Sequence, residues 1–302
     1  LNNPMYFLPT ATEITFTTDA QWSYEANTSK TTAAFVRSYC SPNVGNINVA
    51  GNLTKIVSGI SQNFPTTIRW SQAYANTGIP ATWVPTLSNI ANEQEVPIRG
   101  PMIDGFFLGN NFFMCSYWDT AVLSPISYQS TTAPVFGVRL FNSGRGLFNN
   151  NCWTNTDSKV YGIDSRDIWV FDGSNFDSLA NQKIRHYFFD NLNPTYSGRT
   201  FMINNTNQYQ IEIYYPDLTG WCNKMLSWRY DLNVWNPPKD VQNACAATEA
   251  PLIIAGQYNF ASRTISYAKG STPNSQIIQT GTGTSFSGQP IPTLFERNNM
   301  TF

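Results

Sequence analysis

A strand–turn–strand pattern that returns along the chain constrains its fold more than any other feature. In the first copy, the β-rich runs Gly162-Ile163 and Ile168–Phe171 are joined by a polar turn, and Asp172-Gly173 follows. Gly adopts positive φ without a Cβ penalty, so Asp-Gly predicts a tight turn. Variants of the unit return at 225–235 and at 252–267. Short antiparallel strands that repeat at roughly 40–60 residues are typical of a β-propeller built from blades.

Other runs with alternating or β-branched residues predict further strands. They lie at 5–8, 13–17, 34–37, 54–57, 67–71, 200–203 and 210–215, and 106–115 predicts a hairpin that turns at Gly109-Asn110-Asn111. Helical spacing of Leu179, Ile184 and Phe188 predicts one short helix near 178–189, with Asp177 as its N-cap. The predicted fold class is therefore all-β, a β-propeller-like array of short antiparallel strands with one short helix.

Three segments are expected along the chain. Residues 1–60 form an N-terminal β segment that can belong to the same ring, and 61–281 form the propeller blades. The stretch 282–302 begins rich in Gly, Thr, Ser and Pro, which is typical of a linker. Because the chain starts at Leu1 and stops in what reads as a new element, we expect a fragment whose linker leads into a further region.

Charge is scarce in this chain. Charged residues make up 12% of it and aromatic residues 15%, whereas soluble domains carry about 25% charged residues. A formal net charge of −1 argues against specific nucleic-acid recognition, which needs a basic patch. The densest basic cluster is Arg139 with Arg145, expected to be isolated solvated cations. No apolar run approaches 18–20 residues, so no membrane span is predicted.

Signatures of cofactor and metal chemistry are missing from the sequence. His186 is the only histidine, is expected to be structural, and leaves no His-rich metal site or Ser-His-Asp motif. The five cysteines include no C-x-x-C spacing, which favours buried thiols, although a Cys222–Cys245 disulfide remains an alternative. The sequence predicts no cofactor, no metal and no catalytic residue.

Five acidic residues are candidates for the pair of catalytic carboxyl groups that a glycosidase needs, because propellers can host such enzymes. The candidates are Asp164, Asp167, Asp172, Glu212 and Asp217. Asp172 and Asp217 fit turn positions, and Glu212 lies in an alternating strand where we expect it on the solvated face. Structural roles are favoured for all five, and a hydrolase that uses Asp164 or Asp172 is the lesser alternative.

Three tryptophans in loop-like contexts are candidate aromatic contact residues for a sugar or receptor. They are Trp83, Trp153 and Trp221. The alternative is that these rings attach loops to the core, since burying a large apolar ring stabilises a fold.

The order of several segments resembles the β-propeller virion proteins of tailed bacteriophages, including those of cyanophages. An Ile-Arg-Trp-Ser strand is followed by a tryptophan loop, a Trp-x-Phe-Asp-Gly hairpin, a Glu-Ile-Tyr-Tyr-Pro strand and Tyr-Asp-Leu-Asn-x-Trp. These segments are 41–46, 68–71, 82–86, 136–139, 160–173, 210–216 and 226–235. The resemblance covers roughly residues 40–302 of the 302.

This resemblance implies a structural role without catalysis. Related propellers are rigid hubs or nozzles of the tail, located in the virion after assembly in the host cytoplasm. Their partners are other virion proteins, namely tail, adaptor or fibre subunits, and further copies in a homo-oligomeric ring. The expected function is therefore assembly and docking in a tail or tail-end complex that serves host attachment. A receptor- or carbohydrate-binding module is the alternative, and a propeller glycoside hydrolase is the less favoured one.

Overall fold

The computed structural model describes residues 32–290 with internal gaps, and beyond residue 241 it describes the backbone alone. The gaps are 42–43, 75–79, 81, 127–135, 207, 218–219, 221, 249–251, 255–256, 260–263, 269–275, 281–284 and 287–288. The chain divides into two compact units between Met202 and Ile203. The predicted strands at 5–8 and 13–17 lie outside the described residues.

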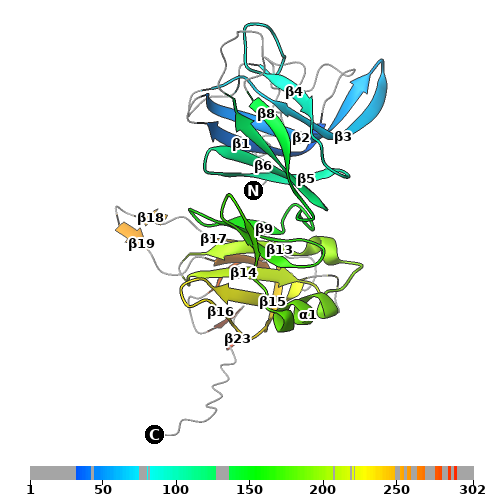
Figure 1. Cartoon of the computed structure of the whole chain (residues 1–302). Coiled ribbons are helices and arrows are strands. Elements are labelled where there is room, and N and C mark those ends of the chain that lie inside the picture. The colour runs from blue at the N-terminus through cyan, green and yellow to red at the C-terminus, as the bar shows by residue number, and fades with distance from the viewer. Residues whose placement is uncertain are drawn as a thin grey trace. The chain divides into compact units, whose positions relative to one another are not determined.

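The first unit contains three four-stranded sheets that follow one another along the chain (Figure 1). The first consists of β1 (Thr32–Ser41), β2 (Gly45–Val57), β3 (Ile60–Trp70) and β4 (Asn92–Glu95). The second consists of β5 (Met102–Leu108), β6 (Asn111–Ser116), β7 (Asp119–Pro125) and β8 (Phe136–Ser143). The third consists of β9 (Trp153–Asn155), β10 (Val160–Ile163), β11 (Ile168–Phe171) and β12 (Phe176–Ser178). Consecutive strands pair antiparallel in all three, as the all-β, propeller-like prediction requires.

Strand β6 of the second sheet is buried on both faces, and its sequence shows how this is achieved. Successive strand residues point to opposite faces. Phe112 and Met114 enter a core shared with the first sheet, where they join Tyr39, Trp70 and other apolar residues. Their neighbours Phe113 and Cys115 enter a second core, shared with Trp169 and other residues of the third sheet. Two apolar faces thus make the sheets stack like consecutive blades.

The first strands of these three sheets are joined by one carboxylate. Asp104 of β5 is completely buried. It accepts hydrogen bonds from Arg37 of β1 and, at 2.8 Å, from the indole N–H of Trp153 at the start of β9. A buried carboxylate is costly unless it is paired and hydrogen-bonded, so these contacts fix the three strands relative to one another.

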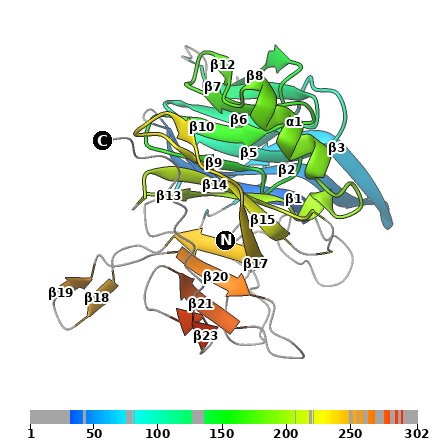
Figure 2. The same ribbon diagram turned by 90° about the horizontal axis from the view of Figure 1, so that it is seen from below.

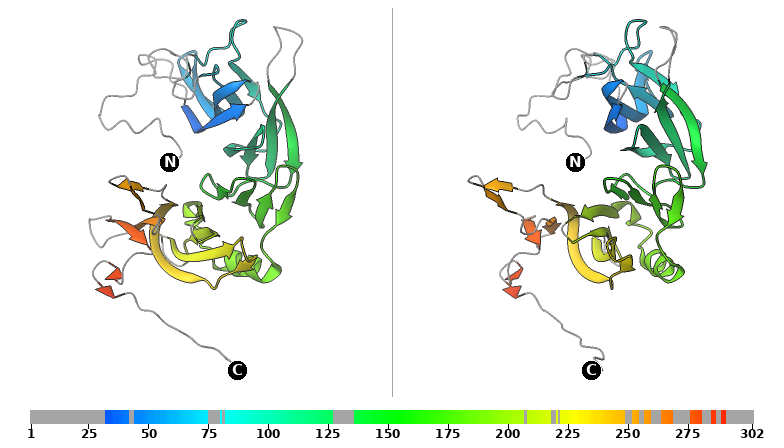
Figure 3. Two further views of the ribbon diagram at one scale, coloured as in Figure 1. Left: turned by 90° about the vertical axis from the view of Figure 1, so that its left-hand side faces the viewer. Right: turned by 60° about the vertical axis from the view of Figure 1, so that its left-hand side comes forward.

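The second unit is a larger sheet that β13 (Phe201–Asn205) enters from the first unit. Its order is β13, β14 (Gln210–Tyr215), β15 (Cys222–Arg229), β17 (Lys239–Thr248), β20 (Thr264–Ala268) and β21 (Gln276–Thr280), with β16 (Val234–Trp235) also paired to β15. The yellow strands of this sheet curve strongly (Figure 3), and β17, β20 and β21 lie side by side (Figure 2). Two two-stranded ribbons accompany it, β18 (Leu252–Ile254) with β19 (Gln257–Asn259) and β22 (Ser285–Phe286) with β23 (Gln289–Pro290).

The predicted helix exists but begins later than expected. α1 spans Gln182–Asn191, and a 3₁₀ turn, η2 (Ser197–Arg199), follows it. Asp177 is not its N-cap, because residues 176–178 form β12 at the edge of the third sheet. The cap is Asn181, whose side chain accepts from the Ile184 backbone N–H. One more strand of the repeat, β12, therefore precedes the helix.

The structure contains the predicted hairpin at 106–115 but no division at the expected boundary after residue 60. The hairpin at 106–115 is present, with Leu108 opposite Asn111 and Gly109 at φ 61° in the turn. The expected boundary after residue 60 coincides with no division of the structure, because β2 and β3 form a hairpin in which Val57 pairs with Ile60. The stretch 282–302 has only β22 and β23 among the described residues.

Candidate functional site

Trp83 is inside the protein. Its side chain is 2% exposed and packs in a small core with Val36, Ala50 and Leu53. Its backbone carbonyl also accepts a hydrogen bond from Arg69 Nε at 3.0 Å. The residue therefore attaches its loop to the first sheet, as the alternative interpretation required, and offers no ring face to a ligand.

Trp153 is half-buried, and both its indole N–H and its ring contact other residues of the protein. Its indole N–H is bonded to Asp104, its ring lies 5.5 Å from the ring of Phe106, and the Arg37 guanidinium sits 5.4 Å from its centroid. The third candidate, Trp221, lies outside the described residues. The two described candidates thus pack in different apolar clusters and do not form one binding surface.

Glu212 corrects one expectation from the sequence. We expected it on a solvated face, but it is 3% exposed. Its Oε1 accepts from the side-chain amides of Asn205 at 2.8 Å and Gln210 at 2.7 Å, and its Oε2 accepts from the Tyr214 hydroxyl at 2.6 Å. Alternation placed it on one face of β14, but both faces of this strand are covered. Both carboxylate oxygens of Glu212 therefore accept structural hydrogen bonds.

The other titratable candidates have local structural roles or exposed positions. Asp172 is exposed and accepts from the backbone N–H groups of Asn175 and Ser174, which hold the pKa of its carboxyl below the usual range. This confirms its turn role. Asp217 donates its backbone N–H to the Asn223 side chain at 2.7 Å. His186 lies on α1 with 67% of its side chain exposed, and its Nδ1 is 3.9 Å from Asp190 Oδ2.

The turn between β10 and β11 is built by Asp164. Its Oδ1 accepts from the backbone N–H groups of Arg166 and Asp167, both at 2.7 Å. Asp side chains commonly close turns by bonding to the backbone two residues on. Its Oδ2 faces the other way and accepts from Arg145 Nη1 at 2.9 Å. The turn therefore leaves one carboxylate oxygen for a long-range ion pair.

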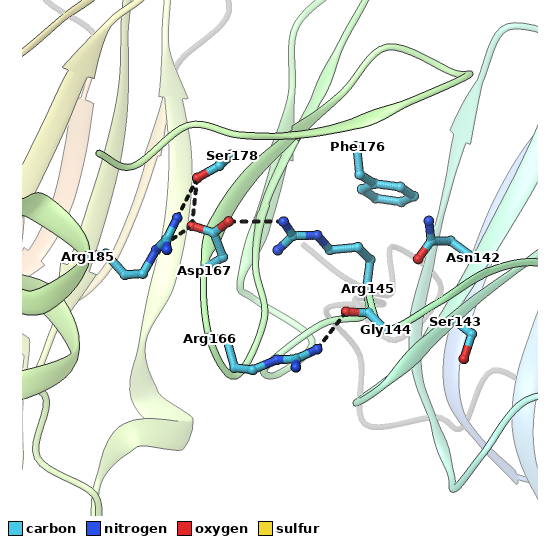
Figure 4. Close-up of a pocket in the computed structure, with 9 residues that line it drawn as sticks. All are labelled: Asn142, Ser143, Gly144, Arg145, Arg166, Asp167, Phe176, Ser178 and Arg185. Carbon is cyan, nitrogen blue, oxygen red and sulfur yellow. Dashed lines mark hydrogen bonds and ion pairs between the residues drawn. The ribbon is translucent and has the colours of Figure 1, made fainter. Parts of the chain in front are cut away.

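Asp167, at the end of the same turn, lies between two arginines (Figure 4). Its Oδ2 is 3.1 Å from Arg145 Nη2, and its Oδ1 is 3.1 Å from Arg185 Nε of α1. The Ser178 hydroxyl of β12 also donates to Oδ1 at 3.0 Å. Only 5% of this side chain is exposed. Asp164 and Asp167 thus share the Arg145 guanidinium and hold it against the turn.

Beside this cluster is a pocket of about 550 Å³. We call it the arginine pocket. It is lined by Asn142, Ser143, Gly144, Arg145, Arg166, Asp167, Phe176, Ser178 and Arg185 (Figure 4). Three arginines thus converge on one hollow of the first unit.

Charge in the arginine pocket is unbalanced. The three arginines contribute +3, and Asp164 and Asp167 contribute −2, which leaves +1. Burial by itself lowers the pKa of Arg145, but the hydrogen bonds and charges of Asp164 and Asp167 outweigh it and hold that pKa above the usual value. Arg166 is exposed and donates to the Gly144 carbonyl at 3.1 Å. Among the described residues no carboxylate lies within 4.0 Å of its guanidinium.

This site corrects the expectation for Arg145, which is no isolated solvated cation. Its side chain is 25% exposed and makes two ion pairs. Arg139, its companion in the sequence, is exposed, with its guanidinium 5.6 Å from the centroid of the Phe141 ring. The pairing was invisible in the sequence because Arg145 and Arg185 lie 22 and 18 residues from Asp167. The one local signal was the Asp-x-x-Asp spacing of the turn.

Within the described part of the chain, no group of three or more His, Cys, Asp or Glu side chains is placed to hold a metal ion. No described helix has the length and apolar character to cross a membrane. No protein-family model and no curated protein matches this chain.

Proposed function

We propose that this chain is a structural component of a tailed-bacteriophage virion, a hub or nozzle-type protein of the tail or tail end. It acts by assembly, docking neighbouring subunits or fibres, and catalyses no reaction. Two things support the proposal. One is the ordered set of segments that resembles phage propeller proteins, and the other is the stack of three four-stranded sheets in the first unit.

The observation that carries the proposal is the joining of three sheets through Asp104. Arg37, Asp104 and Trp153 come from the first strands of consecutive sheets, and the carboxylate between them is completely buried. Removing Arg37 would leave the buried Asp104 charge without its cation, and removing Trp153 would take away one of its hydrogen bonds. Such a connection resists separation of the sheets, which suits a part that bears load in a permanent assembly.

The state of the acidic residues also favours assembly over hydrolysis. A glycosidase needs two carboxyl groups that flank the scissile bond and exchange protons with it. Asp164 and Asp167 are both 5% exposed or less and share Arg145, while Asp172 closes an exposed turn. Both oxygens of Asp164 and of Asp167 accept from structural partners, and Oδ1 of Asp172 closes its turn.

The experiment that tests the proposal is a search for the chain in purified phage particles. Mass spectrometry should detect it there, and cryo-EM should fit the first unit into a symmetric ring on the tail axis. The proposal is overturned if the chain is absent from particles and is found only as a free monomer in the infected cell. A matched measurement on the recombinant chain, by light scattering after gel filtration, reports whether it forms a ring by itself.

A further inference from the structure

The arginine pocket has the features of a ligand site that none of the roles above uses. We infer that it binds the carboxylate of an acidic sugar. The site is independent of the tail proposal, since it rests on pocket chemistry alone. Arg166 supplies the starting point, because it is the pocket's one arginine without an ion pair among the described residues.

The charge of the pocket selects the kind of anion. A guanidinium presents a planar fork of N–H donors that matches a carboxylate or a phosphate. The pocket carries a net charge of +1, because Asp164 and Asp167 offset two of its three arginines. That charge is balanced by a carboxylate, whereas a phosphate monoester carries about −1.5 to −2 at neutral pH and would leave an excess of negative charge.

The neutral groups of the pocket select what the carboxylate is attached to. Asn142 is half-buried, lines the pocket, and makes no side-chain hydrogen bond within the described part of the chain. Its amide supplies two donors and an acceptor. The Ser143 hydroxyl accepts from Arg99 at 3.1 Å and donates its proton to the Asp119 carboxylate, which leaves one lone pair for a further donor. The Asn142 amide and this lone pair fit the hydroxyls of a sugar.

Phe176 supplies an apolar surface at the same place. One side of its ring is stacked on Phe171 at 4.3 Å, and Trp169 meets it at 5.0 Å, so the ring is fixed from inside the core. Its remaining surface lines the pocket, close to Asn142 in Figure 4. A rigid aromatic ring beside polar groups suits a sugar, which has an apolar face and a hydroxylated rim. The hollow has a volume of about 550 Å³ and is open to solvent on one side, which leaves room for a single sugar unit.

The test is isothermal titration calorimetry of the full chain with sodium glucuronate, with glucose, sodium acetate and inorganic phosphate as separate probes. We expect saturable binding of glucuronate and at least tenfold weaker binding of glucose and acetate, since each lacks one half of the recognised chemistry. Arg166→Gln should weaken glucuronate binding at least tenfold, because it removes a charge-assisted hydrogen bond. Arg139→Gln is the matched control, with the same change in charge outside the pocket, and should bind as the parent does.

Folding of the variants is checked by thermal unfolding, and we expect Arg166→Gln to fold because its guanidinium is bonded to a backbone carbonyl and to no buried carboxylate. The inference is overturned if glucuronate shows no saturable binding, or if Arg166→Gln binds it as well as the parent. It is also overturned if acetate or phosphate binds as tightly as glucuronate, since the site would then recognise charge alone. None of these results bears on whether the chain is found in phage particles.

Discussion

Arg37 and Asp104 form an ion pair across the first two sheets, in which Arg37 Nε donates to a completely buried Asp104 Oδ1 at 2.9 Å. The residues lie 67 positions apart in the chain. The same carboxylate accepts from Trp153 on the third sheet and from the Gly105 backbone N–H. One buried side chain thus connects the first strands of three sheets.

Replacing Arg37 tests this relationship directly. Arg37→Leu keeps much of the apolar stem but leaves Asp104 buried without its cation, so we expect a loss of about 3–5 kcal/mol in the free energy of unfolding. Urea denaturation followed by tryptophan fluorescence measures it. Arg139→Leu, an exposed arginine on β8, is the control and should change stability by less than about 0.5 kcal/mol. A similar small effect at Arg37 would contradict the assigned role of the pair.

Trp153→Phe separates the hydrogen bond of this residue from its ring. Phenylalanine retains an aromatic ring against Phe106 but cannot donate to Asp104. We expect a loss of about 1.5–3 kcal/mol, the usual contribution of a hydrogen bond to a charged group. Trp118→Phe, at a ring that is 48% exposed, is the control. Unchanged stability in Trp153→Phe would contradict the role assigned to this hydrogen bond.

Asp119 gives the first unit a dependence on acid. The Arg99 side chain and backbone N–H donate to this carboxylate at 2.6–2.9 Å and hold its pKa below the usual range. A carboxyl whose pKa is depressed in the folded state stabilises the fold above its unfolded pKa of about 3.9, and the stabilisation is lost as pH falls through the folded pKa. We therefore expect stability to fall below about pH 4, and Asp119→Asn to reduce the slope there. Urea unfolding between pH 2 and 7 measures both, and equal slopes would contradict the prediction.

Cys115 and Cys40 should differ sharply in reactivity. Burial raises the pKa of the Cys115 thiol to about 12, whereas Cys40 on β1 is exposed. Because the thiolate is the reactive form, a thiol reagent at pH 8 should modify Cys40 in the native protein and Cys115 only after unfolding. Peptide mapping by mass spectrometry identifies each site, and Cys40→Ser should remove the fast reaction. Rapid native modification of Cys115 would show that its core is open.

Gly162 has no room for a side chain. A Cβ there would lie 2.2 Å from Trp169 Cζ2, and the Trp169 ring is held in the core shared by the second and third sheets. Gly162→Ala should destabilise the unit by about 1–3 kcal/mol, the usual cost of overpacking. Gly198→Ala is the control, since a Cβ there would meet nothing within 4 Å. Equal thermal unfolding temperatures for the two variants would show that the ring can move aside.

Local structure in this protein follows from short stretches of its sequence. Asp172-Gly173 specified its turn, Gly109 specified the hairpin before β6, and alternation of apolar residues specified strands. These features depend on backbone conformation and on hydrogen bonds between residues a few positions apart, so their rules can be read from neighbouring letters. The helix was predicted to begin near residue 178 with Asp177 as its N-cap. Instead, Asp177 lies in β12, Asn181 is the N-cap, and the helix begins at Gln182.

Contacts between residues far apart in the chain are set by the way the sheets pack. It buried Glu212 because both faces of β14 are covered, tied Trp153 to a carboxylate on another sheet, and gathered Arg145, Arg166 and Arg185 around Asp167. Each of these depends on how strands from distant parts of the chain stack, and stacking is set by the burial of whole faces. A charged residue cannot be recognised as buried from its neighbours in the sequence, because its burial depends on what packs against it in the fold. For this reason the arginine pocket could not be predicted.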